Sequence, residues 1–123
     1  MTAHDGLEIG MYSFDCRDAA ALADFWSRVL GRSVDPNATA DYATIGFAEG
    51  GPTWMFVRSD DIAEGRNRLM LDLAGEENWL QHADRVEQFG ATRVAENEVQ
   101  GARWVELRDP ENNTFRIFGP RPQ

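Results

Sequence analysis

The chain has 123 residues, of which 42% are hydrophobic and 27% are charged, so it can fill and cover one core but not two. Its longest apolar stretches are far shorter than the roughly 20 residues of a membrane-spanning helix, and its first residues carry neither a basic segment nor an apolar run for export. We therefore expect one soluble cytoplasmic domain over residues 1–123. The lone cysteine, Cys16, has no partner for an internal disulfide, which agrees with a reducing compartment.

The charge balance excludes one class of partner. Twelve basic residues, all of them arginines, stand against 21 acidic residues, for a formal net charge of −9. A nucleic-acid-binding protein needs a clustered basic surface, and these arginines are scattered along the chain. We expect no nucleic-acid partner. The commoner role of an acidic surface is solubility, and the alternative is attraction of a cationic ligand.

The first predicted elements are a strand over residues 7–15 and a helix over residues 18–31. Apolar residues recur in the helix at i, i+3, i+4, i+7 and i+8, which places one stripe on a single face: Leu22, Phe25, Trp26, Val29 and Leu30. Asp18 is a suitable N-cap, and Gly31 suits the left-handed residue that ends many helices.

Further segments have strand character, and a second helix is predicted over residues 78–90 with Trp79, Ala83, Val86 and Phe89 on one side. The strand segments are residues 32–35 (weakly), 42–47, 53–58, 67–73, 92–95, 103–108 and 114–118. The last two flank DPENN, in which Pro110 suits an early turn position and the two asparagines tolerate positive φ. This sequence predicts a hairpin.

The element order repeats itself. Strand, helix and three strands occur twice, and the proposed caps Asp18 and Asn78 lie 60 residues apart. The acidic, glycine-containing segment 59–65 is the natural joint between the halves. We expect an α+β fold of two βαβββ modules, at about residues 6–60 and 66–119.

This organisation resembles the vicinal oxygen chelate superfamily of glyoxalases, bleomycin-resistance proteins and extradiol dioxygenases, and most of all its glyoxalase-like domains. Four segments carry the resemblance: DCRD at 15–18, LADFWSRVLG at 22–31, NRLMLDL at 67–73 and DPENNTF at 109–115. The resemblance implies that the modules form curved mixed sheets around a cleft. It also implies a homodimer, because members often complete their clefts between chains.

Metal-dependent members of the superfamily hold a divalent ion with His, Gln or Glu from the first and fourth strands of each module. The resemblance places these positions at Met11, Trp54, Met70 and Thr114. The last two are fixed by the letters around them, whereas the first two can shift by one residue. Thioether, indole and hydroxyl groups do not replace imidazole or carboxylate ligands. We therefore expect no metal and no other cofactor, and this expectation argues against metal-assisted isomerisation and ring cleavage.

The two histidines offer no replacement for these ligands. His4 lies near the N-terminus and His82 on the second predicted helix, and no ligand spacing joins them. Cys16 is flanked by Asp15, Arg17 and Asp18, so its neighbours do not favour a reactive thiolate. No Ser-His-Asp set, phosphate-binding glycine loop or nucleotide fingerprint is present.

The proposed cleft is apolar with a few polar groups. Because residues two apart in a strand share a face, the candidate ligand-binding residues are Met11, Trp54, Phe56, Met70, Asp72, Glu106, Thr114 and Arg116. Such a lining is typical of a small-molecule pocket. Several of these residues also have a structural alternative. Trp54 could fill the core, the methionines could close a dry cleft, Asp72 could pair with Arg68, and Glu106 could pair with Arg116 across the strands.

Three functional hypotheses follow. The leading one is a metal-free protein that binds a small aromatic or amphipathic molecule, as drug-sequestering resistance proteins of this superfamily do. The alternative is a metal-independent lyase or isomerase, with Asp72, Glu106 or Tyr12 as the proton-handling group. The third is a non-catalytic partner domain whose cleft is closed. No motif identifies the ligand, since fold and site chemistry are loosely tied.

Overall fold

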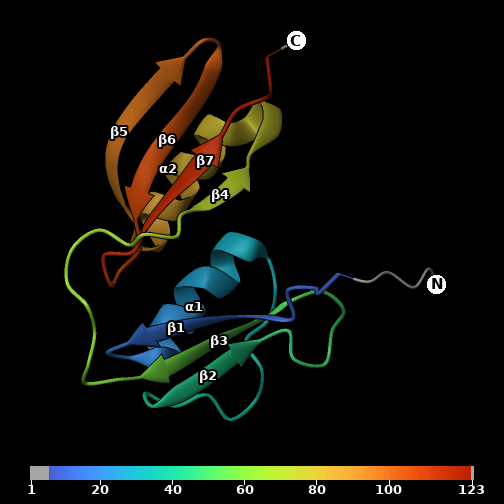
Figure 1. The fold of residues 1–123 in the computed structure, drawn as a ribbon, viewed down its shortest axis with the longest axis vertical. Coiled ribbons are helices and arrows are strands. Elements are labelled where there is room, and N and C mark those ends of the chain that lie inside the picture. Colours follow the sequence, from blue (N-terminus) through green and yellow to red (C-terminus); the bar gives the residue numbers. More distant parts are fainter. Residues whose placement is uncertain (1–5, 123) are drawn as a thin grey trace.

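A computed structural model describes residues 6–122 and shows two modules, each with one sheet and one long helix (Figure 1). His4, one of the two histidines, lies outside the described residues. The first module contains β1 (Met11–Cys16), α1 (Ala19–Leu30), β2 (Tyr42–Ile45) and β3 (Thr53–Arg58). The second contains β4 (Leu71–Ala74), a 3-10 turn (Glu76–Asn78), α2 (Trp79–Phe89), β5 (Thr92–Val99), β6 (Ala102–Arg108) and β7 (Thr114–Phe118).

Both sheets are mixed, and the predicted α+β fold is confirmed. The first sheet has the order β1-β3-β2 and the second β4-β7-β6-β5, with β1 parallel to β3 and β4 parallel to β7. The remaining pairs are antiparallel. The weak strand predicted at residues 32–35 is reduced to a single bridge between Val34 and Ile45. No helix in residues 6–122 is long and apolar enough to cross a membrane.

The first helix begins and ends next to its predicted capping residues, Asp18 and Gly31. The Asp18 carboxylate accepts a hydrogen bond from the amide of Ala21 at 3.2 Å, which satisfies one of the free donors of the first turn. Gly31 ends the helix with φ of 67°, a left-handed conformation that a side chain would strain. The buried stripe of α1 includes Leu22, Phe25 and Trp26, so its apolar face is the one that packs.

Several strands differ in their bounds from the predictions, and β2 ends at Ile45, two residues before its predicted end. β1 begins at Met11 rather than Leu7, and β5 continues to Val99. β4 begins only at Leu71, because the side chain of Asn67 takes over the pairing with β7 at that end. The strand boundaries therefore depend on contacts between distant segments, which a local pattern does not contain.

One hydrophobic core joins the modules. Trp26 of α1 packs on Trp54 of β3, with ring centroids 5.1 Å apart, and on Phe115 of β7, at 4.9 Å. In Figure 1, α1 accordingly lies between the first sheet and the second module, while α2 covers one face of the second sheet. No helix covers the opposite face of either sheet among the described residues. We call these the open faces.

Candidate functional site

A hollow of about 430 Å³ lies where the two modules meet. Its walls are β1, the segment that leads into β4, and the start of β7. We call it the inter-module hollow. Most of its lining is apolar or aromatic, and the side chains that define it include Met11, Ser13, Phe14, Trp26, Leu69, Leu71 and Thr114.

Two of the four positions related to metal ligands meet in this hollow. Met11 on β1 is 41% exposed, and Thr114 at the start of β7 is buried. Met70 precedes β4, is half-buried and does not line the hollow. The site therefore combines an exposed thioether with a buried hydroxyl.

Trp54 and Phe56 lie in the core, which corrects the expectation that they line the cleft. The register of β1 with β3 places Tyr12 beside Trp54 and Phe14 beside Phe56, so these four side chains share the face covered by α1. Trp54 is only 7% exposed. Met55 takes the open face instead, in register with Ser13.

The predicted polar residues form ion pairs on the open face of the second sheet. Arg116 donates two hydrogen bonds to Asp72, from Nε to Oδ1 at 2.6 Å and from Nη2 to Oδ2 at 2.8 Å. This hydrogen bonding raises the pKa of the Arg116 guanidinium. Arg116, not Arg68, is thus the partner of Asp72. Glu106 lies opposite Arg116 in the ladder, but its nearest ion-pair partner is Arg66 at 3.2 Å.

An aromatic pair that the sequence analysis missed lies on the same open face. Trp104 and Phe118 stack with ring centroids 5.3 Å apart and planes 27° apart. The Arg116 guanidinium lies over both rings, at 5.9 and 5.4 Å from their centroids. Strand alternation from Glu106 could have found Trp104, since the two residues are two apart on β6.

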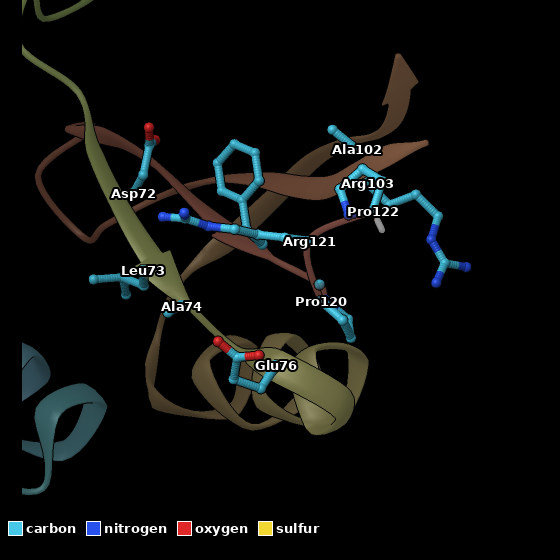
Figure 2. A pocket seen from close by; sticks show the side chains of 11 residues that line it. Asp72, Leu73, Ala74, Glu76, Ala102, Arg103, Pro120, Arg121 and Pro122 are labelled. Atoms are coloured by element: carbon cyan, nitrogen blue, oxygen red, sulfur yellow. The ribbon is translucent and has the colours of Figure 1, made fainter. Parts of the chain in front are cut away.

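A second hollow, of about 340 Å³, lies at the far end of this face. Figure 2 shows it between β4, which carries Asp72 and Ala74, and the C-terminal segment Pro120–Pro122. Glu106 and Thr114 line a third hollow, described below. The predicted ligand-binding residues are therefore spread over several hollows and the core rather than gathered in one cavity.

The residues at the metal-related positions do not fit a metal ion. The positions given by the resemblance are Met11, Trp54, Met70 and Thr114, which are two thioethers, an indole and a hydroxyl and therefore poor ligands for the usual divalent ions. Met55, the neighbour of Trp54 on the open face, is a third thioether. Within residues 6–122, no group of three or more His, Cys, Asp or Glu side chains could hold a metal. His82 lies on α2, where its Nδ1 is 2.9 Å from Arg85 Nη2.

The side chains proposed for acid-base chemistry make contacts with other protein side chains. Asp72 and Glu106 each contact an arginine, and the Tyr12 ring packs 5.3 Å from that of Trp54. Cys16 is fully buried, and burial together with the nearby carboxylates raises the pKa of its thiol to about 11. The geometry gives no support to a proton-transfer or nucleophilic mechanism.

The DPENN turn of the second module makes hydrogen bonds to the first module. Glu111 accepts hydrogen bonds from the backbone amides of Arg17 at 2.6 Å and Asp18 at 2.9 Å, at the start of α1. Asp109 is buried and accepts one from Trp26 Nε1 at 3.0 Å. Three of the four sequence motifs therefore meet here and hold the modules together, which explains why they identify the fold better than the ligand.

Comparison with known proteins agrees with this architecture. A family model described as a glyoxalase-like domain matches residues 11–118. No curated protein sequence matches the chain. Among solved structures, a glyoxalase/bleomycin resistance protein/dioxygenase family enzyme from Burkholderia phytofirmans has a TM-score of 0.76 at 17% identity, with 92% of this chain and 98% of that chain covered.

Two further structures have the same fold. Lactoylglutathione lyase from Agrobacterium tumefaciens has a TM-score of 0.67 at 14% identity, with 94% of this chain and 96% of that chain covered. A fosfomycin resistance protein from Mesorhizobium loti has a TM-score of 0.66 at 12% identity, with 97% and 95% covered. At these identities the likeness establishes the fold alone.

Proposed function

Because this chain belongs to the glyoxalase-like domain family, we propose that it binds a small, largely apolar or aromatic molecule in the inter-module hollow, without a metal. The observation that carries the proposal is the lining of that hollow. Its volume of about 430 Å³ lies within the range of small-molecule pockets, roughly 300–1,000 Å³. Its aromatic and thioether side chains provide stacking and adaptable apolar contact. Sequestration of a toxic compound is the role that suits such a site.

We propose that a second copy of the chain covers the open faces. Met11 and Tyr42 on the first sheet are 41% and 47% exposed, and Met55 and Val57 lie on the same face by register. The second sheet presents the stacked Trp104 and Phe118. Apolar side chains that gather on an uncovered sheet face are typical of an interface. A homodimer that pairs one open face with the other would also enclose the inter-module hollow.

A substitution that fills the hollow tests the binding site. Ser13 is exposed and lines the hollow from β1, so Ser13→Trp should block it without disturbing the core. We expect the affinity for the neutral fluorescent probe N-phenyl-1-naphthylamine to fall by roughly tenfold or more. The control is Ser33→Trp, which places the same side chain at an exposed position after α1. Equal loss in both variants, or none in Ser13→Trp, would refute this site.

A further inference from the structure

We infer that the ligand carries an anionic group, a carboxylate or similar oxyanion, and that Arg108 binds it. The inference rests on the proposed function, since it adds a charged end to the same ligand. It also differs from the cationic ligand that the net charge of −9 left open as an alternative to a role in solubility.

Arg108 lies beside the inter-module hollow. It is the register partner of Thr114 on the open face of the second sheet. A polar hollow of about 280 Å³ is lined by Gly65, Arg66, Glu106, Arg108, Asn112 and Thr114. We call it the arginine hollow. Thr114 also lines the inter-module hollow, so the apolar and polar hollows meet at this residue.

Among the described residues, the charged side chains that line the arginine hollow are Arg66, Glu106 and Arg108, and only Arg108 of these three has no ion pair. Arg116 pairs with Asp72, and Arg66 pairs with Glu106. Arg108 is exposed and has no carboxylate within ion-pair distance in the described part of the chain. A guanidinium matches a carboxylate with two parallel hydrogen bonds, and Thr114 and Asn112 offer further donors. The local charge balance is therefore +1, although the chain as a whole is strongly acidic.

A neighbouring hollow of about 240 Å³ has the opposite character. Asp15, Glu64 and Glu111 line it together with Arg17. Glu111 already accepts two backbone hydrogen bonds, and Arg17 offsets one of the other charges. This acidic hollow would bind a cationic ligand end, so it supplies the competing outcome for the experiment.

Three compounds with the same naphthyl ring and an anionic, a neutral or a cationic polar group provide the test. The dissociation constants of 2-naphthoate, 2-naphthamide and 2-naphthylmethylammonium are measured by isothermal titration calorimetry. We expect 2-naphthoate to bind roughly tenfold more tightly than 2-naphthamide. Arg108→Gln should remove this preference and leave the affinity for the amide unchanged, which also shows that the variant is folded. Arg85→Gln, on α2 at the far side of the second sheet, should keep the preference.

Each other outcome overturns a defined part of the account. Equal affinity for the acid and the amide overturns the anionic ligand but leaves the proposed function standing. Tighter binding of the ammonium compound overturns it in favour of the acidic hollow. A preference for the acid that survives Arg108→Gln overturns the assignment to Arg108. Binding of none of the three compounds at millimolar concentration overturns both this inference and the proposed function.

Discussion

The side-chain amide of Asn67 acts as a strand partner for the backbone of Thr114. Thr114 N donates to Asn67 Oδ1 at 2.7 Å, and Asn67 Nδ2 donates to the Thr114 carbonyl at 3.0 Å. Together the two bonds satisfy both backbone groups at the residue where the inter-module and arginine hollows meet. β4 pairs with β7 only from Phe115 onward. Asn67 therefore holds the start of β7 at Thr114, where β4 provides no partner.

Loss of this amide should destabilise the fold. Asn67→Ala leaves the backbone N–H and C=O of the buried Thr114 without partners, so we expect the free energy of unfolding to fall by about 1–3 kcal/mol. Urea denaturation measures the change. Asn78→Ala is the matched control, because Asn78 precedes α2 without a side-chain capping bond. Similar stability of the two variants would contradict the role given to Asn67.

The buried carboxyl of Asp109 should make stability depend on pH. Burial raises the pKa of Asp109 in the folded protein above its ordinary value. Because the folded state then binds this proton more readily than the unfolded state, acidification from neutral pH towards pH ~4 stabilises the native protein relative to Asp109→Asn. The stability difference between the two proteins is measured by urea denaturation at several pH values. We expect the free energy of unfolding of the native sequence minus that of Asp109→Asn to increase as the pH falls. A decrease of this quantity on acidification would indicate the opposite pKa shift.

The single thiol should be inert in the folded protein. With its pKa raised to about 11, the Cys16 side chain is a thiolate in only about one molecule in a thousand at pH ~8. Burial also keeps the reagent away from the sulfur atom. We expect labelling by iodoacetamide at that pH to be at least about a hundredfold slower in the native than in the urea-unfolded protein. Mass spectrometry follows the reaction. Fast labelling of native protein would restore Cys16 as a candidate nucleophile.

A charge in the centre of an open face should break the proposed homodimer. Met55 lies on β3, the middle strand of the first sheet, and shares the open face with Ser13. Met55→Arg would bury an unpaired charge in the interface and should convert a dimer into a monomer with an unchanged far-ultraviolet circular dichroism spectrum. Light scattering after size-exclusion chromatography measures the mass. A native protein that is monomeric at high concentration would refute the dimer.

Sequence patterns showed which residues of β7 face the core but not which residues of β3 do so. In β7, apolar Phe115 and Ile117 alternate with Thr114 and Arg116, and the structure buries the apolar pair as expected. In β3, by contrast, nearly every residue is apolar, so alternation could not show which face turns to α1. The register with β1 decides it, and this is why Trp54 proved to be a core residue.

The site itself was only partly accessible from sequence. The resemblance nominated Met11 and Thr114 as members of one site, and the structure places both in the lining of one hollow. It could not show that Asp72 pairs with Arg116, or that Arg108 is left unpaired beside Thr114. These facts depend on which strands are neighbours and in which register, information that local spacing does not carry.

The most direct test of the metal-free site is calorimetric titration of 2-naphthamide into protein dialysed against EDTA, and into the same protein supplied with Zn²⁺ or Ni²⁺. Because the apolar lining of the inter-module hollow supplies the binding energy, we expect the two dissociation constants to agree within about twofold. Binding that disappears after EDTA treatment and returns with the metal would contradict the account.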